Sequence, residues 1–310
     1  MKYTKTAVAL ALTGCIAAPM AQADVTLTGQ VAIGIIGTDE DDVPAVLDPT
    51  TSEVITAASR PGDLKMFGDD STINVKATGT LDNGLTGYAN YRTDLGLVGD
   101  VATGDNIHVG IKGDFGDIRV GEVPDATGFG QVAGDVGGAA ISSDIDGENF
   151  GISYTGTFSG VTVGLNWSPE GSSDRVAAGV KFSAGGFGFG VGVGNEGDGG
   201  DDTAEDRTEM SVGATYGIGG GSLALAYKDF DNDRETISAK GSYGFGKTSV
   251  SLTFEMEAGD VNEDDTSLRF DASYDLGSSM NISTRINVFS DDSDSSGDVT
   301  NYRVLLTKAF

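Results

Sequence analysis

The chain repeats one pattern from residue 25 to its end: segments of about ten residues in which apolar side chains alternate with small or polar ones. In the first segment Val25, Leu27 and Ile33 fall on one face, and small and polar residues fall on the other. A period of two predicts a β-strand, because successive side chains of a strand point to opposite faces. Sixteen such segments follow one another, and the last occupies residues 299–310. The sequence therefore predicts an all-β protein.

The connections between these segments are of two kinds, which alternate along the chain. Every second connection is short and contains glycine, as at residues 82–84 and 113–116, which is typical of tight hairpin turns. The others are mostly longer and strongly acidic, as at residues 195–206 and 290–298. Turns on one rim and loops on the other are typical of a membrane β-barrel, whose closure leaves no strand edge unpaired in lipid. We expect a 16-stranded antiparallel transmembrane β-barrel with short periplasmic turns and long acidic extracellular loops.

The first 23 residues have the composition of a secretory signal. Lys2 and Lys5 precede an apolar run, and residues 21–23 form a small-x-small cleavage site. We expect residues 1–23 to be removed and residues 24–310 to form the barrel. An alternative stays open, because Cys15 follows a Leu-Thr-Gly stretch that also fits a lipoprotein signal, in which this cysteine would be lipidated.

The charge balance limits the partners of the chain. Forty-seven acidic residues against 19 basic ones give a formal net charge of −28. Nucleic acid is excluded as an electrostatic partner, because its phosphates are themselves anionic. The acidic residues gather in the long connections, so we expect them to raise the cation concentration at the outer mouth of a barrel.

The period of two also separates the charged side chains. If the apolar face of each strand meets lipid, the opposite face lines the interior, and a cation facing the bilayer midplane would cost about 2–4 kcal/mol. Five basic or imidazole side chains of the second to fifth strands fall on the interior face: Lys76, Arg92, His108, Lys112 and Arg119. We expect them to form a basic wall along a pore. The alternative is that they are simply solvated on the wet side of a two-faced sheet.

The last segment ends in an unprotected aromatic residue. Tyr302, Val304, Leu306 and Phe310 share its apolar face. This arrangement resembles the C-terminal signature by which bacterial outer-membrane proteins are handed to their assembly machinery. Lys308 stands where an aromatic or apolar residue is usual, and its long stem allows the ammonium group to reach the rim.

Three stretches resemble the Gram-negative general diffusion porins: ADVTLTGQVAIGI at residues 23–35, INVKATGTLDNGLTGYANYRTD at residues 73–94 and FGDIRVGEVPDATG at residues 115–128. Thr28 replaces a tyrosine that is common in the first stretch of the family. The resemblance implies a 16-stranded homotrimeric pore in the outer membrane, surrounded by lipid and lipopolysaccharide. It also implies that the third long loop, at residues 123–148, folds into the barrel and narrows it.

The resemblance further implies a role for the acidic residues of that loop. They are Asp125, Asp135, Asp144, Asp146 and Glu148. In the porins that the chain resembles, such groups face a basic cluster on the opposite wall and create a transverse field. The analogous pairing here joins the last four of these residues to Lys76, Arg92, Lys112 and Arg119.

Other motifs have simpler interpretations. The glycine-rich residues 186–202 precede no helix and no Lys-Ser/Thr pair, so we interpret them as a strand with small interior residues followed by an acidic loop. A Ser-His-Asp arrangement would need His108, the only histidine, and we expect neither an enzymatic reaction nor an organic cofactor. Asp292 and Asp294 copy the opening of a calcium loop, but Arg303 stands where its bidentate glutamate belongs. Weak binding of Ca²⁺ or Mg²⁺ by the acidic loops stays a hypothesis.

These observations lead to one main expectation and one alternative. We expect a water-filled, weakly cation-selective channel for passive diffusion of small hydrophilic solutes and ions. The alternative is a secreted or lipid-anchored acidic β-rich adhesin or calcium-binding structural protein.

Overall fold

The computed structural model describes residues 24–40, 46–47, 54–56, 64–69, 71–95, 103–131, 149–170, 173–196, 207–230, 234–259, 265–290 and 299–310. Several predicted features lie outside these ranges: the signal at residues 1–23 with Cys15, and Asp135, Asp144, Asp146, Glu148, Asp292 and Asp294.

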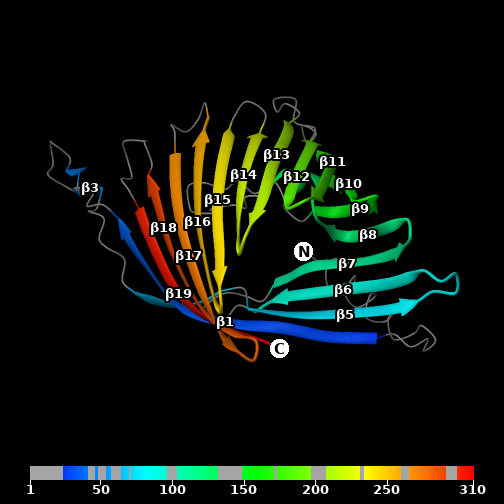
Figure 1. Ribbon diagram of the computed structural model, residues 1–310, viewed down its shortest axis with the longest axis horizontal. Helices are drawn as coiled ribbons and strands as arrows, with labels where there is room; N and C mark the ends of the chain where they lie inside the picture. The colour runs from blue at the N-terminus through cyan, green and yellow to red at the C-terminus, as the bar shows by residue number, and fades with distance from the viewer. Residues whose placement is uncertain are drawn as a thin grey trace.

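Sixteen long strands form the described structure, and each pairs antiparallel with its neighbours, which confirms the prediction of a 16-stranded barrel (Figure 1). Their bounds are β1 Asp24–Glu40, β5 Thr72–Thr80, β6 Thr86–Asp94, β7 Thr103–Gly113, β8 Gly116–Val123, β9 Asn149–Phe158, β10 Val161–Glu170, β11 Ser173–Ala184, β12 Phe187–Glu196, β13 Arg207–Ile218, β14 Gly221–Phe230, β15 Glu235–Phe245, β16 Thr248–Ala258, β17 Asp265–Gly277, β18 Met280–Ser290 and β19 Val299–Ala309. The short glycine-containing connections are the hairpin turns that their sequences predict.

The barrel closes through its first strand. One edge of β1 pairs with β19, from Gln30 opposite Ala309 to Glu40 opposite Val299. The other edge pairs with β5 through the first seven residues of β1. Phe310 completes the seam through two backbone hydrogen bonds. Its amide donates to the Gly29 carbonyl at 3.0 Å, and its carbonyl accepts from the Gly29 amide at 3.1 Å. Closure therefore gives the backbone N–H and C=O groups at the strand edges hydrogen-bond partners, which lipid could not provide.

Three short strands lie within the first long connection, residues 38–70, and they were not predicted from the sequence. β4 (Lys65–Gly68) pairs with β1 beyond the end of β5, so that it continues the line of β5 after an interruption. Ser71 bridges the interruption, since its hydroxyl accepts from the Ala32 amide at 2.9 Å and donates to the Ala32 carbonyl at 3.2 Å. β2 (Val46–Leu47) and β3 (Val54–Thr56) pair with each other.

The distribution of side chains is the reverse of that in a water-soluble protein. Large apolar residues such as Val25 and Leu225 are exposed over more than half of their surface, whereas Lys228, Glu255 and Glu257 are fully buried. Hydrocarbon therefore suits the outer surface, and the charged groups face inward. Within the described ranges no helix is long and apolar enough to cross a bilayer.

Aromatic rings gather on the outer face beside the short turns. Phe187 and Tyr216 lie on neighbouring strands with ring centroids 4.4 Å apart, and Tyr243 and Phe245 stack at 6.2 Å. Such belts form where aromatic rings meet the boundary between lipid and water. Lys308 reaches this same rim, where its ammonium group donates to the Ser278 carbonyl at 2.5 Å.

Candidate pore wall and inserted segment

The five predicted wall residues lie together on the inner face of four neighbouring strands, β5 to β8. Lys76, Arg92, His108, Lys112 and Arg119 all line one open cavity of about 410 Å³. Their strands alternate apolar residues outward with polar residues inward, which is why residues far apart in the sequence share one surface. The structure therefore assembles the predicted basic cluster.

A tyrosine that the sequence analysis missed lies at the centre of this cluster. The ammonium groups of Lys76 and Lys112 lie 5.7 and 5.9 Å from the centroid of the Tyr88 ring, and His108 meets the ring edge-on at 5.9 Å. The negative face of an aromatic ring attracts cations at such distances. The period of two already placed Tyr88 on the same face as Arg92, and this signal could have found it.

The arginines of the wall are partly neutralised by acidic residues on their own strands. Arg119 forms an ion pair with Asp117 at 3.0 Å, and Arg92 lies 3.6 Å from Asp94. Each acid stands two residues from its arginine, so the same alternation that turns the arginine inward turns the acid inward as well. The Tyr88 hydroxyl also donates to Asp117 at 2.5 Å. The wall is therefore less positive than its basic residues alone suggest.

The beginning of the third long connection folds into the barrel. Its short 3-10 helix η1 (Ala126–Gly130) contacts the inner faces of β10 to β14. Glycines make room for it: a Cβ atom added at Gly190 or Gly192 would lie well under 3.0 Å from a backbone oxygen of η1. The prediction that β12 presents small residues to the interior is thus confirmed, and the inserted backbone occupies the space that they leave.

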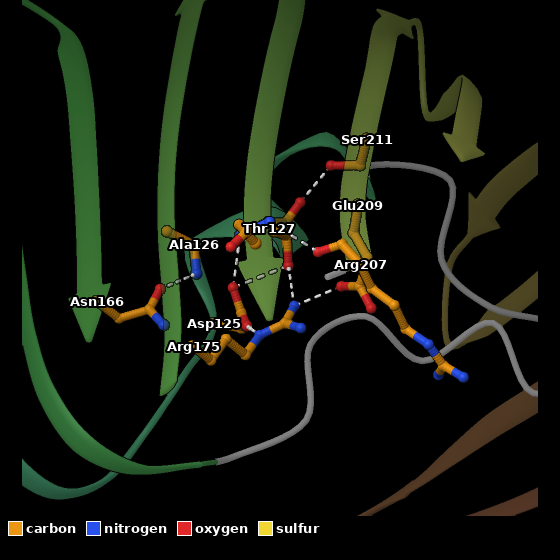
Figure 2. A network of polar contacts seen from close by, with 9 residues as sticks. Asp125, Ala126, Thr127, Asn166, Arg175, Arg207, Glu209 and Ser211 are labelled. Atoms are coloured by element: carbon orange, nitrogen blue, oxygen red, sulfur yellow. Dashed lines mark hydrogen bonds and ion pairs between the residues drawn. The ribbon is translucent and has the colours of Figure 1, made fainter. Parts of the chain in front are cut away.

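An acidic residue anchors the entry of this inserted segment. Asp125 caps η1, because its carboxylate accepts from the Thr127 amide at 2.9 Å and from the Thr127 hydroxyl at 2.8 Å. The same carboxylate pairs with Arg175 on β11, and Arg175 also pairs with Glu209 on β13. Figure 2 shows the guanidinium group pointing between the two acids. One arginine thereby ties the inserted segment to two strands of the wall.

Further hydrogen bonds hold the backbone of η1 in place (Figure 2). The side-chain oxygen of Asn166 accepts from the Ala126 amide at 2.7 Å. The Ser211 hydroxyl donates to the Thr127 carbonyl and accepts from the Gly130 amide, the latter at 3.1 Å. Donors and acceptors at both ends of η1 therefore find partners in β10 and β13, as buried backbone groups require.

Asp125 is one of the five acids predicted for the inserted loop, and the predicted pairing with the basic wall did not include it. Its side chain is 0% exposed and is paired with Arg175. A carboxylate buried against the barrel presents no charge to the open pore. No sequence signal indicated the two partners of Arg175. The other four acids of the predicted set lie outside the described residues.

Metal binding finds no support in the part of the chain that the structure describes. There, no group of three or more His, Cys, Asp and Glu side chains is arranged to hold a metal ion. The calcium hypothesis for Asp292 and Asp294 concerns residues outside that part.

A closed barrel that is apolar outside, charged inside and occupied by an inserted segment defines the chain as a transmembrane β-barrel of the pore-forming class. The sequence matches the profile of the Gram-negative porin family over residues 6–294, and the chain belongs to this family. It is accordingly a multi-pass protein of the outer membrane. No curated protein matches the sequence.

Solved structures share the fold at low sequence identity. A loop-deletion mutant of OmpT, an outer membrane protein of Vibrio cholerae, has a TM-score of 0.70 and 16% identity, covering 93% of this chain and 99% of that chain. A triple mutant of the Rhodopseudomonas blastica porin has a TM-score of 0.68 and 19% identity, covering 93% and 100%. OmpT in a trimer form has a TM-score of 0.65 and 16% identity, covering 93% and 99%.

Proposed function

We propose that the protein forms a water-filled channel through which small hydrophilic solutes and ions diffuse passively across the outer membrane. The observation that carries this proposal is the charged inner face around Tyr88, opposite in character to the apolar outer face of the same strands. Charged side chains inside a barrel are stable in contact with water. The proposal requires no chemical step and no cofactor.

We propose a weak preference for cations. The wall at Tyr88 favours anions, but two of its arginines are partly neutralised by ion pairs with Asp117 and Asp94. The net charge of −28 is concentrated in the long acidic connections, which raise the local concentration of cations at the outer mouth. The contribution of the mouth outweighs that of the partly neutralised wall.

The proposed channel is tested by adding purified protein to planar lipid bilayers in a salt gradient. We expect stepwise conductance in linked groups of three and a reversal potential of the sign that cations give. The preference is expected to shrink between 0.1 M and 1 M salt, because the Debye length falls from about 10 Å to about 3 Å. A verified folded sample that never conducts would contradict the channel, whereas anion preference would contradict only the selectivity.

We further propose that three copies form the working unit, with lipid and lipopolysaccharide around them. The trimer form of OmpT supports this proposal, because that protein has the same fold. The grouping of conductance steps in threes is its direct readout.

We also propose that residues 1–23 are removed and that the mature chain begins at Asp24.

The proposed assembly signal on β19 can be tested by substitution. We expect Phe310→Ala to lower the amount of folded protein in the outer membrane severalfold, because the assembly machinery is proposed to bind this ring. Phe245→Ala is the matched control, since Phe245 is an aromatic residue of the same rim and is 53% exposed against 59% for Phe310. Both variants keep the backbone bonds of the seam. Equal losses in heat-modifiability assays of membrane fractions would show that the ring acts only as a lipid anchor.

A further inference from the structure

A second polar surface lines the barrel on strands β13 to β19, away from the cluster around Tyr88. It surrounds an open cavity of about 500 Å³. The described lining contains Lys240, Arg285 and Arg303 against one carboxylate, that of Asp271, together with several serine side chains. This surface is therefore net positive and rich in hydroxyl groups.

Six of its residues stand directly opposite one another on consecutive strands. The row is Ser222, Ser242, Ser251, Asp271, Arg285 and Arg303. Ser222 is the second residue of β14, next to a short turn, whereas Arg303 lies in the middle of β19. Because the strands of a barrel tilt against its axis, a row across them climbs along the wall. The row therefore leads from the middle of the barrel to its short-turn rim.

The two arginines at the upper end of the row form an unusual pair. Arg285 and Arg303 oppose each other on β18 and β19, an arrangement that like charges normally disfavour. Separate acids offset the repulsion, since Arg303 pairs with Asp69 and Arg285 pairs with Asp271, each at 2.6 Å. The latter contact uses the Nε atom of Arg285, so it leaves the two terminal nitrogens of this guanidinium group available to another acceptor.

The lower end of the row offers neutral hydrogen-bonding groups. The hydroxyls of Ser222 and Ser242 lie 2.7 Å apart, and a second pair, Ser249 and Ser273, lies alongside at the same distance. Each serine hydroxyl donates one hydrogen bond and accepts others, so it matches the hydroxyl groups of a polyol without holding it by charge.

We propose that this row is a binding lane for small solutes that carry an oxyanion at one end and hydroxyl groups at the other, as a sugar phosphate does. The planar fork of Arg285 suits the oxygens of a phosphate group, and Lys240 adds a second positive charge. The serine hydroxyls then form hydrogen bonds with the hydroxyl end of the solute on the side toward the rim. Neutral partners let the solute leave, as passage through a channel requires. This inference rests on the proposed channel function.

The test uses the intact protein in planar bilayers in KCl, with glucose 6-phosphate, glucose or inorganic phosphate added. We expect glucose 6-phosphate to reduce the ion current at concentrations at which glucose does not, and inorganic phosphate to act more weakly. Arg285→Gln should raise the half-blocking concentration about five- to tenfold, as the loss of a charge-assisted hydrogen bond predicts. Lys247→Gln is the matched control, because it removes the same charge from an exposed short turn.

A second variant keeps the inference testable if Arg285→Gln folds poorly. Replacing both Ser242 and Ser251 by alanine should weaken the block by glucose 6-phosphate and leave that by inorganic phosphate unchanged. Channels that conduct KCl but respond alike to glucose and glucose 6-phosphate would overturn the lane while leaving the channel intact. Equal block by inorganic phosphate and glucose 6-phosphate would overturn the role of the serines. Absence of any conductance would refute the channel itself.

Discussion

Gly190→Val is expected to detach the inserted segment from the barrel wall and to increase the single-channel conductance. A Cβ atom at this position would overlap the carbonyl oxygen of Phe129, which belongs to the backbone of η1 and cannot rotate away as a side chain does. Overpacking of this kind costs about 1–3 kcal/mol. The segment relieves the overlap by leaving the wall, and the lumen becomes wider. Single-channel recordings measure the change.

Gly79→Val is the matched control for that experiment. Gly79 also lies within a strand, β5, but a Cβ atom added there would meet nothing within 4 Å. Its conductance should equal that of the unsubstituted protein. If Gly190→Val conducted no more current than Gly79→Val, the docking of η1 on the glycines of β12 would not narrow the pore.

Arg175→Gln should destabilise the protein by about 3–5 kcal/mol, the cost of leaving a buried charge without its partner. The side chains of Asp125 and Glu209 are only 0% and 13% exposed, so water cannot replace the lost guanidinium group. Urea-induced unfolding in detergent micelles, followed by the change in gel mobility, gives the free energy of unfolding.

Two further variants identify the cause of that loss. Asp125→Asn combined with Arg175→Gln should recover part of the stability, because an amide keeps the cap on Thr127 without an unpaired charge. Arg285→Gln should cost no more than about 1 kcal/mol, since Arg285 is 32% exposed and solvent screens its ion pair with Asp271. Equal costs for Arg175→Gln and Arg285→Gln would contradict the special role of the buried network.

Local patterns explain why the barrel could be predicted from the sequence. The alternation of apolar and polar residues identified every long strand, and it also placed Lys76 and Arg92 on the interior face. The same alternation also places Tyr88 on the interior face. Tyr88 was overlooked because aromatic residues are expected on the apolar face of a barrel strand. Short β4 was missed because four residues inside an acidic connection are too few for a period to show.

The network around Asp125 could not be predicted, because it depends on contacts between distant parts of the chain. Asp125 and Arg175 are 50 positions apart, and Ser211 is 84 positions from Thr127. Nothing near Asp125 in the sequence distinguishes an anchoring acid from one that faces the pore. The small residues of β12 indicated free space on the interior face, but they did not show which segment would fill it.

The pairing of Phe310 with Gly29 has a consequence for the order of folding. The seam joins the first strand of the barrel to the last, so a chain that lacks either strand cannot complete the barrel. Until the last strand has paired with β1, the sheet has two open edges and an apolar face, a state prone to aggregation. Contacts at such long sequence separation also form slowly. The topology therefore makes closure a late, all-or-none event. The chain must remain unfolded in transit until closure can occur.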